Sequence, residues 1–576
     1  MNDKRQLSLD SLPAETIYQI LDLLHCETIF ISFANVCRRF RSIIQTYHRC
    51  HIDFSSISKS NFHIICRIVR PENVVSLILS DDEKTPGQIG LFLSFLNINT
   101  FRQLRHLTLM KIAAADLMKI SRRLKLCSLI SFTIDTRGRH IKLPVKMITC
   151  VIEQPSLCKM NLITMGPVLD KISWPMNCPL QHLKIQTCTK KQYLTIIDRL
   201  PHLKTLDIAL YDVHATVSTS STIHRSLVTL TLNIGSMPMV RLESLLLLTP
   251  SLVHLKLVSH NGDLDLMSNS SRWEEFIQLA LPELEKFEFF FSVAHRRQAF
   301  LLDIEPLIEP FRRPFWLEHK HWYVCCEQSG TSQFRTDLYT IPICVTRLKY
   351  QKLLRKVCST VNNLPNNSTC RVSSLDVDLT GKLMPSVLKE NRPNTIVLFD
   401  KVIDVNLTLH GEKILESIQF ISTFIDFSRL QQISIRLITV VKSKDNTVVN
   451  FGILLEQAGN LRSLTIRRGW GWYEYAEHLN GILSMLPGQL KHLRVDIRTT
   501  EQMKEVFQQI SHVSSVAYRY TGWEHLRFDD FLAWLTEKGT DFTSITIGDE
   551  LHMWLGKNGR KPNEILYPNK RLKTSL

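Results

Sequence analysis

The sequence predicts an α/β protein with two parts, a small N-terminal helical module and a long, irregular array of strand–helix repeats. Three observations predict this architecture. The chain has 576 residues, which is too many for one ordinary hydrophobic core. A short pattern of the form L-x-x-L-x-L, in which other apolar residues can replace leucine, recurs along most of the chain. Segments with apolar residues at helical spacing separate these patterns.

The first fifty residues are predicted to form helices. The tetrapeptide Leu12-Pro13-Ala14-Glu15 opens the first helix, with Ser11 as the candidate N-cap and Pro13 in the first turn. Apolar residues follow at helical spacing, first at Ile17, Ile20, Leu21, Leu23 and Leu24, and then at Ile29, Phe33, Val36, Cys37 and Phe40. So small a module cannot hide all these side chains, which predicts a partner surface. A plain helical cap on the following domain is the alternative.

Residues 7–48 resemble an F-box. They contain the L-P-x-E opening of that family, a hydrophobic helix, and the segment Val36-Cys37-Arg38-Arg39-Phe40, which corresponds to the family pattern V-C-[RK]-x-[WF]. Phe40 stands where the family often has Trp, and the turn over residues 26–31 carries neither Asp nor Pro. The resemblance implies docking onto the Skp-type adaptor of a cullin–RING ubiquitin ligase. By position, the contact residues would be Leu12, Pro13, Ile20, Leu24, Val36 and Phe40.

The repeated pattern covers residues 74–300 and returns in residues 351–556. In the first array it occurs nine times, with successive starts 23 to 32 residues apart, close to the 20–29 residues that are usual for leucine-rich repeats. The starts in the first array are Val74, Leu104, Leu129, Leu157, Leu180, Leu203, Leu227, Leu252 and Leu284. Those in the second array are Val372, Leu430, Leu461, Leu490, Val513 and Phe542. The number of repeats between residues 350 and 429 is left open, because the pattern there is degraded.

Each repeat is predicted to contain one strand and one helix, and stacked repeats would form a horseshoe-shaped leucine-rich-repeat solenoid. Helical stripes such as Tyr193, Ile196, Ile197 and Leu200 lie between the strand patterns. At the level of pattern, the chain resembles the leucine-rich-repeat F-box proteins. Residues 49–73 are expected to be a linker and residues 557–576 a basic tail. In the irregular segment 301–350, residues 315–324 are predicted to form an aromatic strand, either in an expanded repeat or seam or, alternatively, at a ligand site.

Side chains between the strand leucines are predicted to point to the concave face, because strand side chains alternate. Basic residues dominate these positions, and the candidates for target binding are Lys184, Lys256, Arg436, Arg467 and Arg494. This pattern favours an acidic or phosphorylated segment of a target protein. Solvated charges on an exposed sheet are the alternative. The loop Gly469-Trp470-Gly471-Trp472-Tyr473 is either an exposed aromatic contact or packs on the next helix.

No catalytic constellation is found in the sequence. It lacks the phosphate-binding loop, the dinucleotide-binding glycine pattern, the G-x-S-x-G elbow and the H-E-x-x-H zinc motif. The 14 cysteines are scattered, with no pair at the spacing of a zinc knuckle or redox motif, so we read them as reduced core residues. We therefore expect no enzyme activity, no cofactor and no metal.

Composition favours a protein of the cytoplasm, the nucleus or both. No apolar run is long enough for a membrane span, and the polar N-terminus does not read as a secretory signal. The formal net charge of +16 favours acidic partners.

The predicted function is that of a substrate-recognition subunit of a ubiquitin ligase, with the F-box bound to the Skp-type adaptor and the repeats bound to a target protein. The alternative is a non-catalytic scaffold or a nucleic-acid-associated repeat protein. We do not expect a nucleic-acid partner, because neither a known reader module nor base-stacking aromatics on the basic face is found.

Overall fold

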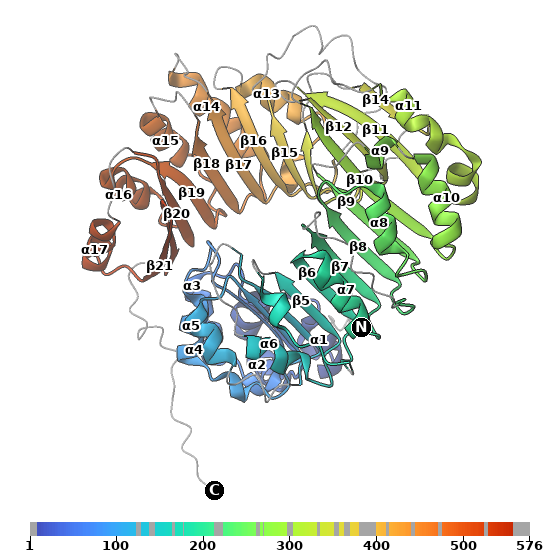
Figure 1. Cartoon of the computed structure of the whole chain (residues 1–576). Helices are drawn as coiled ribbons and strands as arrows, with labels where there is room; N and C mark the ends of the chain where they lie inside the picture. The colour runs from blue at the N-terminus through green and yellow to red at the C-terminus, as the bar shows by residue number, and fades with distance from the viewer. Residues whose placement is uncertain are drawn as a thin grey trace, which may run out of the picture.

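The computed structural model of the chain describes most of its residues: 9–121, 128–137, 145–163, 167–176, 178–211, 223–260, 265–268, 270–295, 303–330, 334–350, 356–361, 369–379, 399–410, 414–438, 444–469, 475–522 and 528–556. Strands and helices alternate along it. Within these residues, the protein is a mixed α/β fold with two large, mostly parallel sheets (Figure 1).

In the described part of the chain, the first sheet has 13 strands, and its first ten are arranged in chain order and pair in parallel. These are β1 (Cys50–Asp53), β2 (Val74–Ser80), β3 (His106–Met110), β4 (Ser131–Asp135), β5 (Lys159–Ile163), β6 (His182–Cys188), β7 (Thr205–Leu210), β8 (Thr229–Ile234), β9 (His254–Ser259) and β10 (Lys286–His295). Three antiparallel strands complete the sheet in the order β12 (Phe334–Ile341), β11 (Tyr323–Gly330) and β14 (Lys356–Ser359).

The second sheet has nine strands among the residues that the structure describes, and it is parallel except at its last edge. Its parallel strands are β13 (Arg347–Tyr350), β15 (Ser374–Asp378), β16 (Asp404–His410), β17 (Gln432–Ile438), β18 (Ser463–Arg468), β19 (His492–Ile497) and β20 (Ser515–Tyr520). The strand β22 (Glu550–Leu555) then pairs antiparallel with β20 and with the edge strand β21 (Phe542–Ile547).

Helices follow most strands and cover the outer side of the sheets. Those of the first fifty residues are α1 (Ala14–Leu21) and α2 (Arg38–Thr46), with short helical turns between them. The others are α3 (Lys59–Ile68), α4 (Gln88–Phe95), α5 (Ala114–Ser121), α6 (Val145–Ile152), α7 (Lys190–Arg199), α8 (Met239–Leu246), α9 (Asp265–Ser268), α10 (Ser270–Ala280), α11 (Glu305–Ile308), α13 (Ile414–Ile421), α14 (Lys444–Gln457), α15 (Tyr475–Leu483), α16 (Thr500–Gln509) and α17 (Asp529–Glu537).

The helix α7 illustrates how the sequence produces this arrangement. Thr189 caps its N-terminus, and Gln192 completes a capping box by accepting from the Thr189 backbone. Its predicted apolar stripe is buried, as are the alternate residues of the neighbouring strand β7. The stripe and the strand leucines therefore meet in one layer between helix and sheet. The remaining strand residues point to the inner side of the curved sheets, where Figure 1 shows no helices.

Several local predictions are wrong. Residues 315–319 form a helical turn, so the predicted aromatic strand begins only at Tyr323. Pro314 stands at the start of this turn, and the turn buries the rings of Phe315 and Trp316 in the core. Ser11 lies in a separate short turn, and Pro13 occupies the N-cap position of α1 without a side-chain cap.

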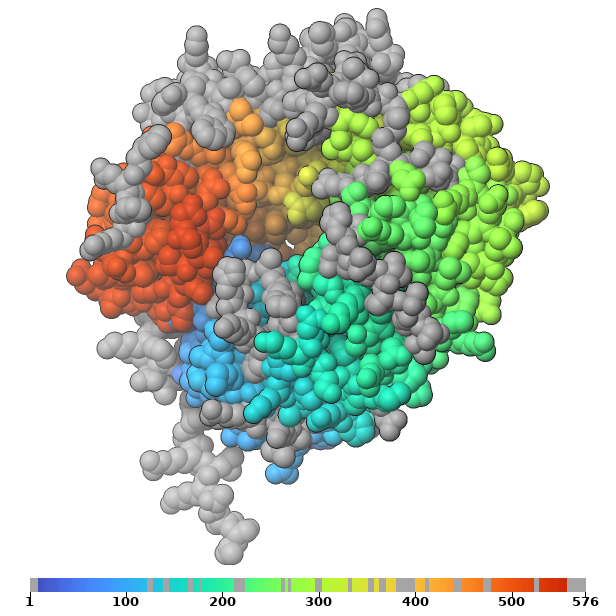
Figure 2. Space-filling view, in the orientation of Figure 1, coloured from blue at the N-terminus to red at the C-terminus, as the bar shows by residue number. Residues whose placement is uncertain are grey.

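Residues 57–86, near the first edge of the first sheet, contact residues 541–554 at the last edge of the second sheet, which gives the molecule the outline of a ring (Figures 1 and 2). The Trp554 Nε1 donates a hydrogen bond of 2.9 Å to the Ile57 carbonyl oxygen, and its ring packs edge-on against Phe62. The Thr543 hydroxyl donates to the Pro86 carbonyl oxygen at 2.7 Å. The contact is made by side chains, and within the described residues no strand pairing joins β1 to β21.

Candidate functional site

Two surfaces correspond to the sites predicted from the sequence, and the first is the N-terminal segment. Its helices α1 and α2 are joined at both ends. The Arg39 guanidinium donates to the Leu12 carbonyl oxygen, and the Tyr47 hydroxyl donates to the Asp22 carboxylate, each at 2.5 Å. Cys37 begins α2 by accepting from the Phe40 backbone N–H. These contacts fix the ends of the two helices relative to each other.

The six predicted adaptor contacts differ in exposure. Pro13 is exposed, and Val36 is 66% exposed, so both are accessible to a partner. The side chains of Leu12, Ile20 and Leu24 are half-buried. Phe40 is only 3% exposed and stacks on Phe33 with ring centroids 4.3 Å apart. Its side chain is thus part of the segment's own core in this structure.

One strongly exposed residue was missed among the contact candidates. Leu23 follows α1 and is 87% exposed. In the sequence it lies in the run Ile20-Leu21-Asp22-Leu23-Leu24, and helical spacing places it away from the buried Leu21. That spacing was the signal which could have separated the exposed leucine from the buried one.

The second surface is the inner face of the sheets, and its two parts differ. In the first sheet the candidate cations already have partners. The Lys184 ammonium lies 2.6 Å from the Asp207 carboxylate on the adjacent strand. The Lys256 ammonium donates to the Cys344 carbonyl oxygen, so it ties β9 to the segment that precedes the second sheet.

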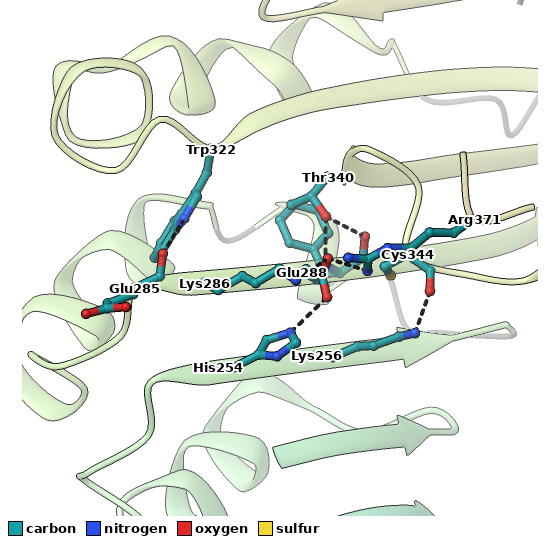
Figure 3. A network of polar contacts seen from close by, with 10 residues as sticks. His254, Lys256, Glu285, Lys286, Glu288, Trp322, Thr340, Cys344 and Arg371 are labelled. Atoms are coloured by element: carbon teal, nitrogen blue, oxygen red, sulfur yellow. Dashed lines mark hydrogen bonds and ion pairs between the residues drawn. The ribbon is translucent and has the colours of Figure 1, made fainter. Parts of the chain in front are cut away.

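Lys256 belongs to a polar network at the joint between the sheets (Figure 3). At its centre, the Glu288 carboxylate contacts His254 at 2.8 Å, Arg371 at 2.5 Å and Lys286 at 3.3 Å. Burial opposes ionisation of Glu288, but the hydrogen bond from His254 and the charges of Arg371 and Lys286 lower its pKa to about 2. The network links the two sheets, and both carboxylate oxygens of Glu288 have partners within the protein.

In the second sheet, four arginines gather on neighbouring strands. Arg436 on β17 is the register partner of Arg467 on β18. Arg494 on β19 and Arg519 on β20 continue the group. The Arg519 guanidinium lies 2.6 Å from the buried Asp496 carboxylate. We call Arg436, Arg467, Arg494 and Arg519 the arginine cluster.

Two members of the arginine cluster are paired, whereas two are not. The Arg494 guanidinium contacts Glu550 and, at 3.3 Å, Glu83 of the loop after β2. Within the described part of the chain, neither Arg436 nor Arg467 has a hydrogen bond or ion pair, and the buried Arg467 Nε lacks an acceptor.

The pKa values of the Arg467 guanidinium and the Asp496 carboxyl depend on burial and on the positive charges of the arginine cluster. Burial and the positive charges of the other three arginines lower the pKa of the Arg467 guanidinium. Burial raises the pKa of the Asp496 carboxyl to about 6, although the nearby arginines act in the opposite direction. Positive charge at Arg467 is therefore only partly compensated by the protein.

A cavity of about 390 Å³ opens beside the two unpaired arginines. Its lining includes Arg436, Arg467, Arg347 and the acids Asp376 and Asp378. Arg347 engages Asp376 through two hydrogen bonds, of 2.7 and 3.0 Å, and Asn406 donates to the same carboxylate at 2.8 Å. The donors in this cavity that have no partner among the described residues therefore include those of Arg436, Arg467 and Lys349.

Some predicted features cannot be placed. The aromatic loop from Trp470 to Tyr473 and the basic tail 557–576 lie outside the described residues. Within the described ranges, no three His, Cys, Asp or Glu side chains are grouped so that they could hold a metal ion. The helices described there include none with the length and apolar character that crossing a membrane requires.

Comparison with known proteins gives no match for this chain, neither among protein-family models nor among curated proteins. The functional proposal therefore rests on the residues and geometry of the two surfaces.

Proposed function

We propose that the protein is a non-catalytic substrate receptor of a cullin–RING ubiquitin ligase, acting in the cytoplasm, the nucleus or both. Its first fifty residues would be an F-box bound to the Skp-type adaptor. The remainder would be a leucine-rich-repeat solenoid whose inner face holds a target protein. In this role the protein would supply no reactive group. It would accelerate transfer by holding the target near the transferring enzyme, which raises the target's effective concentration.

The observation that carries the proposal is the exposure of apolar side chains within the F-box-like segment. Leu23 and Val36 lie outside the hydrophobic core, and Pro13 of the L-P-x-E opening is exposed as well. Burying one such side chain at an interface contributes about 1.5–3 kcal/mol. An apolar contact with the adaptor would use these side chains.

The repeated strand–helix arrangement supports the second half of the proposal. Parallel strands in chain order, with helices on the outer side, leave a long inner face lined by alternate strand residues. Extended inner faces of this kind are suited to binding another protein. The arginine cluster gives this face a positive region, which favours an acidic or phosphorylated segment of the target.

The proposal is tested by capture of the purified chain on immobilised Skp-type adaptor. The test variant carries Leu23→Asp and Val36→Asp, which place charges on the predicted interface without disturbing buried side chains. A matched control carries Leu279→Asp and Val240→Asp, because these residues are similarly exposed, 86% and 59%, on helices α10 and α8. Wild type and control are expected to bind, and the test variant is expected to lose binding while keeping its thermal stability.

Absence of binding by the folded wild-type chain would overturn the ligase-receptor proposal. Binding of the test variant as tight as that of the control would show that the exposed side chains of the N-terminal segment are not the adaptor surface. The salt dependence of the captured complex gives an independent check. An apolar interface should change little between low and high salt, whereas binding through a nucleic-acid contaminant should fall steeply.

A further inference from the structure

Of the five candidate target-binding cations, Arg436 and Arg467 are the two that have no hydrogen bond or ion pair within the described residues. They are register partners on adjacent parallel strands, so their side chains emerge side by side from the same face of the sheet. Lys184, Lys256, Arg494 and Arg519 all contact carboxylates or a carbonyl oxygen of the protein. The two unpaired guanidiniums therefore offer donors that the fold itself does not use.

Arg467 is held in place despite an electrostatic cost. Its Nε is buried without an acceptor, and three other arginines lie close to it. A buried donor that lacks a hydrogen bond destabilises the folded protein, because the group has lost its contacts with water. An anion bound in the cavity would supply the missing acceptor and would also relieve the repulsion within the arginine cluster.

The charge and shape of the cavity select among anions. Two adjacent guanidiniums present two planar sets of donors, which match the three terminal oxygens and the charge of about −1.5 to −2 of a phosphomonoester. A single carboxylate has two oxygens and one charge, so it would satisfy one guanidinium only. The lining acids oppose negative charge, but Arg347 and Asn406 engage Asp376, which reduces its effect.

A nucleic-acid backbone fits the inner face less well. A polynucleotide needs a continuous track of free cations along its phosphates. On the first sheet, Lys184 is paired with Asp207 and Lys256 is engaged at the joint. On the first sheet Lys159 is left as a single cation without a described partner, whereas on the second sheet Arg436, Arg467 and Lys349 line one cavity. The unpaired positive charge is therefore concentrated in that cavity and does not form a continuous track.

We infer that the cavity beside Arg436 and Arg467 binds a phosphomonoester dianion, held by both guanidiniums. The inference rests on the proposed use of the inner face as the target-binding surface, and it gives the target a chemical class: a protein segment with a phosphorylated side chain. A small soluble phosphate compound offers the same chemistry, and the experiment distinguishes the two sources.

The test measures binding of fluorescent peptide pools to the full chain by fluorescence anisotropy at constant ionic strength. One pool has random sequence around a central phosphothreonine, and the other has threonine at that position. The site variant carries Arg436→Gln and Arg467→Gln. The control variant carries Lys159→Gln and Lys184→Gln, which remove the same charge from the inner face of the first sheet.

The phosphorylated pool is expected to bind wild type and control at least about tenfold more tightly than the unphosphorylated pool, the scale of one charge-assisted hydrogen bond. The site variant is expected to lose this preference. Pyrophosphate, titrated by calorimetry, is the probe for a soluble source. Pyrophosphate binding that needs both arginines, without preference for the phosphorylated pool, would support the phosphate site but assign it to a soluble compound.

The inference is overturned if neither probe binds, or if the site variant binds as wild type does. Either failure leaves the adaptor capture experiment unaffected, because that experiment depends on the N-terminal segment. Conversely, adaptor capture can fail while phosphate binding persists, which would overturn the ligase role and leave an anion-binding repeat protein. Thermal unfolding of the site variant serves as the folding control, and its stability should equal or exceed that of wild type because two repelling charges are removed.

Discussion

The Lys59 ammonium lies 2.6 Å from the Asp541 carboxylate, although 482 positions separate the two residues in the chain. Their surroundings differ, since the Lys59 side chain is 4% exposed and the Asp541 side chain 38%. Burial lowers the pKa of Lys59, and the hydrogen bond with Asp541 acts in the opposite direction. The pair joins the first and last parts of the ring. The buried Lys59 ammonium has little contact with water and relies on Asp541 to balance its charge, whereas the Asp541 carboxylate is partly hydrated.

This asymmetry predicts unequal losses of stability for the two single substitutions. Asp541→Asn leaves a buried ammonium beside a neutral amide, and we expect a loss of about 2 kcal/mol, less than the 3–5 kcal/mol of a fully buried pair because Asp541 is partly exposed. Lys59→Met removes the buried charge and keeps the packing, so its effect should stay below about 1 kcal/mol. Urea unfolding followed by tryptophan fluorescence measures both. Equal losses would contradict this account of the pair.

The contact of Trp554 with Ile57 gives a second prediction about the closure of the ring. Trp554→Phe keeps most of the ring packing against Phe62 but removes the 2.9 Å hydrogen bond and leaves the buried Ile57 carbonyl oxygen without that donor. The expected loss is about 1–2 kcal/mol. Trp534→Phe on α17 is the control, because Trp534 is only partly buried and its ring contacts do not require the indole N–H. A smaller loss for Trp554→Phe than for the control would argue against a stabilising closure.

Repeating local patterns made much of the strand order predictable from sequence. The strand cores at Leu183, Leu206 and Leu230 align in register on neighbouring parallel strands, because period-two alternation fixes which residues are buried. The sequence did not predict the strands β1, β12, β13, β14, β16 and β22, although Val402-x-x-Val405-x-Leu407 at β16 fits the pattern. The degraded pattern around residues 380–398 obscured the spacing there.

Contacts between distant parts of the chain were not predictable in the same way. Nothing local to Lys59 or Asp541 indicates that they pair, and the closure of the ring depends on the curvature accumulated over both sheets. The predicted last repeat at Phe542 is an edge strand whose residues are only partly buried, because β22 takes the place beside β20. Likewise, sequence spacing placed Lys184 and Arg467 on the same face but could not show that only Lys184 has an acidic partner.

The contrast between Phe40 and Val36 yields a prediction about the N-terminal segment. Phe40→Ala removes a buried ring that stacks on Phe33 and should cost about 3 kcal/mol or more. Val36→Ala should change stability by less than about 0.5 kcal/mol, because the side chain is mostly exposed. Hydrogen exchange of α1 and α2 measures local stability for both variants. Protection unchanged in Phe40→Ala would show that this ring is not part of the core.

Glu288 predicts a defined pH dependence. Its pKa of about 2 in the folded protein lies below the ordinary value of 4.5, so its contribution to stability is present above pH 4.5 and is lost as the pH falls towards 2. The shift corresponds to about 3 kcal/mol. Glu288→Gln should therefore be clearly less stable than wild type at pH 7, and the gap should narrow below pH 4.5. The neighbouring, exposed Glu285→Gln is the control, and a gap that is constant with pH would contradict the assigned shift.

Gly469 gives the last prediction, which concerns the strands that carry the two unpaired arginines. A Cβ at this position would lie 1.6 Å from the Leu437 carbonyl oxygen and 2.9 Å from the Ile438 Cα, and both are backbone atoms. Gly469→Ala must therefore separate β17 from the end of β18, at a cost of about 3 kcal/mol or more. Gly459→Ala is the matched control, since no atom lies within 4 Å of its added Cβ, and its effect should stay within about 1 kcal/mol. Thermal unfolding compares the two variants.

If Gly469→Ala keeps wild-type stability, the close contact between Gly469 and the Leu437 carbonyl oxygen is absent from the protein. If it is destabilised as expected, its binding to the phosphothreonine pool should weaken as well, because the register that aligns Arg436 with Arg467 depends on this contact.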